Sequence, residues 1–288
     1  MKLALAKLRL VLHLLHGMWI VAVRFPRMSD AAKLEVNRAW SIKMLRLAGM
    51  RLVVHHDEAR IDHGALVVGN HVSWLDIYVV NAWRPTPFVS KAEVRHWPVV
   101  GWLAHQLGTI FIHREKRRDA HRTMHEIVER VSSGGLVCLF PEGTTSDGLA
   151  LLPFHANLFQ AAVSAQCPVQ PICLLYEDGE GRQSTVPAYV GDVSLAQSLD
   201  AVLKGGPFTA HLYVGEPIQP MADRRALSAK AREAVGAGLA QLQARAACPV
   251  GQQDSPVRAD AADGADARAG SDQRDDDPSI EGALTPRH

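Results

Sequence analysis

The stretch HVSWLD, residues 71–76, decides how this chain folds locally and carries its most informative side chains. It follows an apolar run, residues 65–69 (ALVVG), which predicts a buried strand. Ser73 is a suitable N-cap for a helix that begins near Trp74. Residues at i and i+5 are not stacked neighbours within one helix. If His71 lies just before that helix and Asp76 in its first turn, the chain can curl so that the carboxylate reaches the imidazole.

The spacing of His71 and Asp76 suits acid–base chemistry. A carboxylate on one ring nitrogen of a histidine fixes the tautomer and makes the other nitrogen more basic. Such a pair can take a proton from a hydroxyl group as that group attacks an acyl carbon. The alternative is that Ser73 and Asp76 form only a capping pair and that His71 is an ordinary loop histidine.

Strand-like and helix-like segments alternate along the middle of the chain. Strands are expected at residues 52–55, 65–69, 86–89, 108–112, 136–140, 169–175, 186–190 and 209–215. Helices are expected at residues 74–83, 98–106, 117–132, 154–164, 194–204 and 223–246. This alternation predicts an α/β domain over residues 52–248, with a mostly parallel central sheet flanked by helices. Because His71, Arg114 and Glu142 each follow a predicted strand, one cleft at the carboxyl ends of the strands can hold all three.

Two further blocks strengthen the pattern that begins at His71. Residues 108–114 read GTIFIHR, and residues 140–144 read FPEGT. Together with the H-x4-D spacing of residues 71–76, they resemble the glycerolipid acyltransferase family, and the family's proline-bearing fourth block is matched less specifically by residues 168–172 (PVQPI). The resemblance covers residues 50–220. Within the family, residues 146–148 (SDG) and 152–154 (LPF) look most like the branch that acylates lyso-ornithine lipid.

The resemblance implies a membrane-associated enzyme that moves a fatty acyl chain from acyl-CoA or acyl carrier protein to the free hydroxyl of a lysolipid. The default acceptor is 1-acyl-sn-glycerol-3-phosphate, which gives phosphatidic acid, and lyso-ornithine lipid is the alternative. His71 is the candidate general base, and Asp76 is the residue that orients it. The candidate substrate-binding residues are Arg114, Glu142, Gly143, Thr144 and Pro171.

Each candidate binding residue has a chemical reason. The guanidinium of Arg114 can hold a phosphate in bidentate fashion. Glu142 cannot bind an anion when ionised, so it bonds the acceptor hydroxyl or anchors a basic side chain, whereas the loop at Gly143 and Thr144 offers backbone N–H groups and a hydroxyl. Pro171 is expected to form a structural wall of the site. His155 stands where related sequences often carry Lys or Arg, which favours a zwitterionic acceptor.

Neither a cofactor beyond the acyl-thioester co-substrate nor a metal is expected. The four cysteines show no metal-ligand spacing and no short paired motif. His55, His56 and His63 lack a matching set of carboxylates. Without a G-x-S-x-G elbow or a cysteine beside His71, direct attack is favoured over a covalent enzyme intermediate. Ser73 is the alternative nucleophile, although capping explains it better.

The N-terminal region is basic and apolar. Residues 1–51 hold ten Lys or Arg against Asp30 and Glu35, and residues 10–23 form an uncharged run of 14 residues. That run is short of the ~20 residues of a clean membrane span, and residues 31–54 predict an amphipathic helix with a basic face. Residues 1–51 are therefore expected to lie in the membrane interface, with a single marginal span or two ordinary packed helices as alternatives. Interleaved basic and apolar residues favour lipid over nucleic acid as the partner, at the cytoplasmic face of an inner membrane.

The end of the chain has a different composition. Residues 249–288 hold nine acidic residues against four arginines and few large apolar residues, which predicts a disordered acidic tail. Two other function classes stay open: a non-catalytic lipid-binding protein of the same fold, and an esterase or thioesterase that uses water. The intact pair of His71 and Asp76 argues against the first class. A dry apolar tunnel beside His71 would argue against the second.

Overall fold

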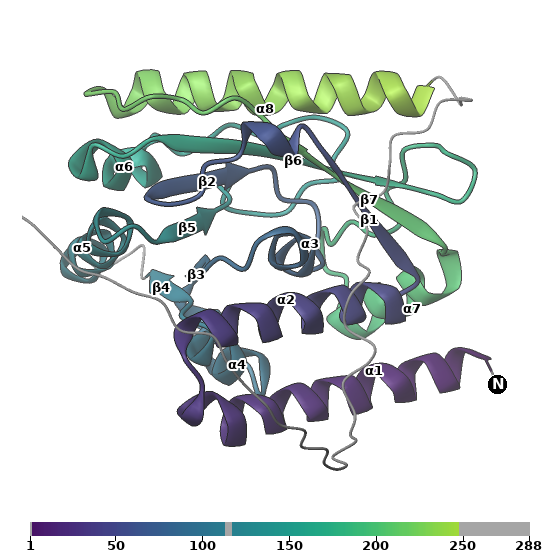
Figure 1. Cartoon of the computed structure of the whole chain (residues 1–288). Coiled ribbons are helices and arrows are strands. Elements are labelled where there is room, and N and C mark those ends of the chain that lie inside the picture. The colour runs from purple at the N-terminus through teal and green to yellow at the C-terminus, as the bar shows by residue number, and fades with distance from the viewer. Residues whose placement is uncertain (1, 113–116, 248–288) are drawn as a thin grey trace, which may run out of the picture. The chain divides into compact units, whose positions relative to one another are not determined.

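A five-stranded sheet forms the centre of the fold (Figure 1). The computed structural model describes residues 2–112 and 117–247. In spatial order the strands are β1 (Met50–His55), β7 (Phe208–Val214), β6 (Val169–Glu177), β2 (Ala65–Gly69) and β5 (Leu136–Leu139). Neighbouring strands run parallel except for β6 and β7, which are antiparallel. The prediction of a mostly parallel sheet is therefore confirmed.

A short strand pair extends the sheet beyond β5. Strands β3 (Val89–Lys91) and β4 (Ile110–Ile112) pair in parallel, and Phe88 forms a parallel bridge with Cys138 of β5. The carboxyl end of β3 thereby lies at the same edge as the ends of β2 and β5. This arrangement gathers three strand-to-loop junctions in one place.

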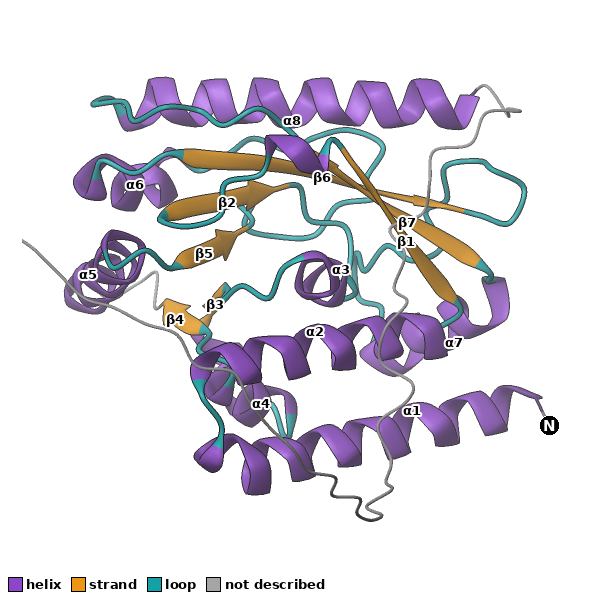
Figure 2. Ribbon diagram, in the orientation of Figure 1, coloured by secondary structure: helices purple, strands orange, loops and turns teal. Residues whose placement is uncertain are grey.

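Helices cover both faces of the sheet (Figure 2). Helix α8 (Arg224–Ala247) packs on one face, and helices α2 (Asp30–Leu47) and α3 (Asp76–Trp83) lie on the other. The remaining helices of the domain are α4 (Val100–Gln106), α5 (Arg117–Ser132), α6 (Gln160–Ala165) and α7 (Leu195–Gly205). Leu227, Ala231 and Val235 of α8 are buried at four-residue spacing, which is the apolar face of an amphipathic helix.

Strand β2 lies in the interior and carries the chain to His71. Its five residues are all buried, as expected for a strand that helices cover on both faces. Gly69 ends the strand where space is short, because a Cβ there would lie 2.9 Å from Cγ1 of Ile172. The next residue, Asn70, donates to the carbonyl oxygen of Leu174 at 2.9 Å and accepts from the Leu174 N–H at 2.7 Å. The start of the HVSWLD loop is therefore anchored to β6.

The N-terminal helix is longer than its uncharged core suggests. Helix α1 (Lys2–Trp19) continues through a π-helical turn (Ile20–Arg24) and a 3-10 turn (Phe25–Arg27). By length and composition, the 26-residue stretch Lys2–Arg27 is long and apolar enough to cross a membrane. Seven large apolar side chains of α1 and the π-helical turn are 42% to 56% exposed, and we call them the exposed stripe of α1. They are Leu5, Leu8, Val11, Leu12, Leu15, Trp19 and Val23.

Three expected elements differ from the observed ones. The strand expected at residues 86–89 is observed as β3, at Val89–Lys91. The helix expected over residues 31–54 ends at Leu47, because Gly49 takes a φ of 76° and the chain from Met50 onward pairs with β7. The strand expected at residues 186–190 is wrong, since Tyr189 donates its N–H to Val72 in the HVSWLD loop rather than to a strand. The predicted tail, residues 249–288, lies outside the described residues, and the domain boundaries stay a prediction.

Candidate active site

Asp76 and His71 meet at the amino end of α3. Oδ2 of Asp76 lies 2.8 Å from Nδ1 of His71 and also accepts the backbone N–H groups of Val72 and Ser73, at 2.7 and 3.0 Å. Oδ1 accepts the hydroxyl of Tyr176 at 2.5 Å. Asp76 is fully buried, whereas 22% of the His71 side chain is exposed. The curl of the chain expected from the sequence is thus what the structure has.

The hydrogen bonds around Asp76 define the protonation pattern of the pair. Burial and the neighbouring Asp76 hold the pKa of Tyr176 well above its usual range, so Tyr176 remains a donor. A carboxylate that accepts from two backbone amides and a phenol acts as an acceptor toward His71 as well. Nδ1 of His71 therefore carries its proton, and Nε2 of the neutral ring has a free lone pair.

Phe140 sets the plane of the His71 ring. The two rings stack with centroids 4.2 Å apart and an interplanar angle of 4°. Phe88 stacks in turn on Phe140, with centroids 6.0 Å apart. Because the ring of His71 is held at its face and at Nδ1, it presents the Nε2 edge in one orientation.

The loop after β5 lies beneath His71. Glu142 is 3% exposed; its Oε1 accepts the N–H of His71 at 3.2 Å, and its Oε2 accepts the N–H of Leu152 at 3.3 Å. Burial raises the pKa of Glu142 to about 7. The Ser146 N–H donates to the carbonyl oxygen of His71 at 2.8 Å. The side chain of Glu142 thus joins the HVSWLD loop to the segment at Leu152, and it does not line the cavity.

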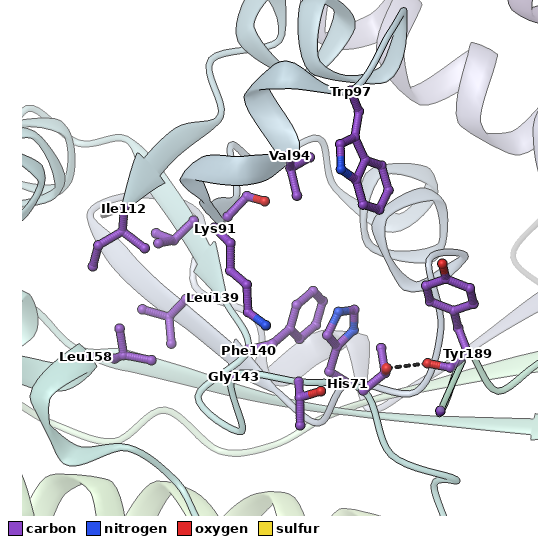
Figure 3. A pocket seen from close by; sticks show the side chains of 15 residues that line it. His71, Lys91, Val94, Trp97, Ile112, Leu139, Phe140, Gly143, Leu158 and Tyr189 are labelled. Atoms are coloured by element: carbon purple, nitrogen blue, oxygen red, sulfur yellow. Dashed lines mark hydrogen bonds between the residues drawn. The ribbon is translucent and has the colours of Figure 1, made fainter. Parts of the chain in front are cut away.

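A cavity of 390 Å³ opens above His71 (Figure 3). It is lined by His71, Val89, Ser90, Lys91, Val94, Trp97, Ile112, Leu139, Phe140, Gly143, Thr144, Thr145, Leu158, Tyr189 and Gly191. Lys91 reaches from the end of β3 toward Phe140 and His71. The Thr145 hydroxyl donates to the carbonyl oxygen of Tyr189. This hydrogen bond holds the loop of residues 184–193 against the wall of the cavity. The cavity therefore combines a histidine, a cation and apolar walls.

A second, apolar cavity adjoins the first. Its volume is 140 Å³, and it lies between α1, α2, α3 and α4. Its lining includes Val21, Phe25, Tyr78, Phe88 and Leu103. Ser90 and Val94 belong to the walls of both cavities. An apolar chain that enters beside His71 thus has an apolar space next to it.

The structure brings together some of the sequence-predicted site residues. His71, Gly143 and Thr144 line the 390 Å³ cavity, and Asp76 supports His71 from behind. Glu142 is buried below the cavity. Arg114 lies outside the described residues.

Pro171 and His155 do not line this cavity. Pro171 is buried in β6, in register with Val68 of β2 and packed against Gly215. His155 is exposed, so it gives no preference for a zwitterionic acceptor. As far as the described residues go, no group of three His, Cys, Asp or Glu side chains can hold a metal ion.

Sequence reasoning missed Lys91, Tyr176 and Tyr189. Lys91 comes two residues after the strand expected at residues 86–89. Because sites in such sheets open at the carboxyl ends of strands, this position could have identified it. Tyr176 lies 100 residues after Asp76, and no local pattern connects the two. Tyr189 was placed in a strand that does not form.

Comparison with known proteins agrees with this geometry. Residues 51–175 match the model of the acyltransferase family. A Rhodobacter capsulatus lyso-ornithine lipid O-acyltransferase is 36% identical over 188 residues, which are 63% of this chain and 68% of that protein. A 1-acyl-sn-glycerol-3-phosphate acyltransferase of Neisseria meningitidis is 38% identical over 174 residues, 60% of this chain and 66% of the relative, slightly less than two thirds of its length.

A solved structure shares the fold. The 1-acyl-sn-glycerophosphate acyltransferase of Thermotoga maritima superposes with a TM-score of 0.58 at 24% identity, over 83% of this chain and 98% of that one. The matched segment, residues 51–175, contains the HVSWLD loop, the strand that leads to it and the FPEGT loop beneath it. With a relative matched over 68% of its length at 36% identity, the chain belongs to the acyltransferase family.

Proposed function

We propose that this protein is a membrane-associated O-acyltransferase that moves a fatty acyl chain from a thioester to the free hydroxyl of a lysolipid. The observation that carries the proposal is the buried Asp76, which holds Nδ1 of His71 at 2.8 Å while His71 lines an open cavity. This is the arrangement that a general base for a hydroxyl nucleophile requires. The family relationship supports the same reaction class.

The reaction follows from the orientation of His71. Nε2 of His71 takes the proton of the acceptor hydroxyl while the oxygen of that hydroxyl attacks the carbonyl carbon of the thioester. When the tetrahedral intermediate collapses, the C–S bond breaks, and the proton passes from the imidazolium to the leaving thiolate. Asp76 holds the imidazolium at Nδ1 and stabilises its positive charge. The products are the ester and a free thiol, and no covalent enzyme intermediate is needed.

The two cavities suit the two parts of the substrates. Lys91 offers a positive charge to the head group of the acceptor, and we assign Thr144 to the same wall. The apolar 140 Å³ cavity suits an acyl chain. The sequence-predicted roles of Arg114, Glu142, Gly143 and Pro171 in substrate binding remain predictions, and the position of Glu142 favours a supporting role.

The leading acceptor is 1-acyl-sn-glycerol-3-phosphate, and the product is phosphatidic acid. Lys91 in the cavity favours an anionic head group. Lyso-ornithine lipid is the second candidate, because relatives of that name match this chain at 36% to 39% identity. A non-catalytic lipid-binding protein of the same fold is the remaining alternative.

The membrane and the acyl donor complete the proposal. The exposed stripe of α1, with Leu8, Leu15 and Trp19 among its members, supports binding to a membrane interface. We assign this interface to the cytoplasmic face of an inner membrane. Acyl-CoA and acyl carrier protein both remain candidate donors. Neither a metal nor a further cofactor is part of this mechanism.

The test is acyl transfer by the purified protein in detergent. Labelled acyl-CoA and acyl carrier protein are each offered with lysophosphatidate and with lyso-ornithine lipid, and His71→Ala and His105→Ala are run beside the wild type. We expect transfer to lysophosphatidate that His71→Ala abolishes and His105→Ala, an exposed histidine of α4, retains. Transfer to lyso-ornithine lipid alone would move the assignment to the second acceptor. Transfer to neither, with both donors tried, would contradict the proposal.

A further inference from the structure

A groove lies between α1 and α2, separate from the two cavities described above. Its volume is 410 Å³. We call it the basic groove; its lining residues are Arg9, Leu12, His13, His16, Lys43 and Leu47. The residues of α1 recur at spacings of three and four, and the two residues of α2 are four apart, so each helix contributes one face. The two helices run antiparallel beside each other (Figure 1).

His13 is the buried part of the basic groove. It is 4% exposed, its ring stacks on Trp40 with centroids 4.7 Å apart, and Nε2 lies 3.0 Å from the carbonyl oxygen of Trp40. The indole N–H of Trp40 donates back to the carbonyl oxygen of His13 at 3.2 Å. Since a carbonyl only accepts, Nε2 carries a proton. Nδ1 of His13 is buried and has no hydrogen-bond partner among the described residues. Such an atom is unusual unless a ligand or water completes the site.

The basic groove carries positive charge without a compensating acid among the described residues. Burial lowers the pKa of His13, and the charges of Lys43 and His16 lower it further. On the same helices, Lys7 pairs with Asp200 and Lys33 pairs with Asp30. Within the described part of the chain, neither Arg9 nor Lys43 forms an ion pair. An anion placed in the groove would meet the charges of Arg9 and Lys43, and a hydroxyl on the same molecule could donate to the unpartnered lone pair of Nδ1 of His13.

The occupant needs an apolar part as well as a negative charge. Leu12 and Leu47 line the groove beside the basic residues, and Leu12 also belongs to the exposed stripe of α1, at 56% exposure. A free phosphate would leave this apolar lining in contact with water, and a nucleic acid would do the same. A phospholipid places its acyl chains along the stripe and its phosphodiester between the two helices.

We propose that the basic groove binds the head group of an anionic phospholipid of the membrane on which α1 lies. The inference rests on the proposed membrane association, and this lipid is neither the acceptor nor the acyl donor of the reaction. The bound lipid joins α1 to α2 through its phosphodiester. In this way it fixes the angle at which the catalytic domain faces the membrane.

The test compares two double variants that remove the same charge from the same helices. The groove variant is Arg9→Gln with Lys43→Gln. The control variant is Arg24→Gln with Lys33→Gln, in which Lys33 lies about 15 Å along α2 from Lys43 at 1.5 Å per residue. Binding of dihexanoylphosphatidylglycerol, kept below its micellar concentration, is measured by calorimetry, with dihexanoylphosphatidylcholine and inorganic phosphate as separate titrants.

We expect saturable binding of phosphatidylglycerol to the wild type, at least tenfold weaker binding to the groove variant and unchanged binding to the control variant. Phosphatidylcholine and inorganic phosphate should not saturate at the same concentrations. Equal losses in both variants, equally tight binding of inorganic phosphate, or no binding at all would overturn the inference. Acyl transfer by the wild type in neutral detergent, measured in parallel, separates failure of this site from failure of the proposed function.

Discussion

Asp76 determines the chemistry of the site at the scale of single residues. It accepts hydrogen bonds from His71, from two backbone amides and from Tyr176, and it is fully buried. Four donors around one carboxylate fix it in position. The orientation of His71 therefore depends on groups that lie far apart in the sequence.

Tyr176 is the positioning residue that can be tested most cleanly. Tyr176→Phe removes one hydroxyl and keeps the ring, so we expect kcat to fall about tenfold, the equivalent of ~1.4 kcal/mol in the barrier. Because the Tyr176 hydroxyl bonds Asp76 and does not line the cavity, KM should stay unchanged. Tyr213→Phe on β7 is the matched control and should change neither quantity. An effect on KM alone would contradict the assigned role.

Glu142 gives a pH dependence of stability. Burial raises its pKa to about 7 in the folded protein, above the usual 4.5. The folded state thus binds the proton more tightly than the unfolded state, and stability falls as the pH rises from about 4.5 to 7. The glutamine of the Glu142→Gln variant cannot titrate. The free energy of unfolding of this variant should therefore fall less between pH 5 and pH 8 than that of the wild type. Urea unfolding at both pH values measures the difference, and equal losses in the two proteins would refute the assignment.

At the scale of helices and strands, the contact between α8 and the sheet depends on one glycine. A Cβ at Gly238 would lie 2.8 Å from Cδ1 of Tyr213 and 3.1 Å from Cβ of Cys173. At Gly236, on the same helix, the nearest atom is Cδ1 of Leu151 at 3.6 Å, which is an ordinary contact. The small residue is therefore needed at one position and not at the other.

The pair of substitutions Gly238→Ala and Gly236→Ala tests this packing. Overpacking costs about 1–3 kcal/mol, whereas replacing a helical glycine by alanine gains about 1 kcal/mol. We expect Gly238→Ala to lower the free energy of unfolding and Gly236→Ala to raise it, both measured by chemical denaturation. Stabilisation by both substitutions would show that α8 moves to accommodate the methyl group.

Elements with a strong local pattern were predictable, and those held by distant contacts were not. The run at residues 65–69 and the periodic segment at 117–132 form the expected strand and helix. The expected strand at 186–190 fails because Tyr189 bonds to the HVSWLD loop, a contact that no local pattern encodes. For the same reason the pair of His71 and Asp76 could be predicted from its spacing, whereas Tyr176, which lies 100 residues from Asp76, could not.

At the scale of the whole chain, the proposed membrane association depends on the exposed stripe of α1. Replacing Leu8 and Leu15 by Gln removes two large apolar side chains from the stripe, at ~1.5 kcal/mol each or more. We expect partition of the protein into vesicles to weaken by about 100-fold in co-sedimentation. Leu149→Gln with Leu195→Gln removes two exposed leucines outside the stripe and should leave partition unchanged. Equal losses in both variants would contradict the role of the stripe.

The central claim is that His71 activates the hydroxyl of a lysolipid, and not water, toward an acyl thioester. The most direct measurement follows a labelled acyl chain in a single turnover and quantifies the two-chain lipid and the free fatty acid with and without the acceptor. The account predicts that the label appears in the two-chain lipid, that little fatty acid is released, and that His71→Ala slows transfer by at least about 100-fold. Release of fatty acid at the same rate with and without the lysolipid, or transfer by His71→Ala at the wild-type rate, would contradict it.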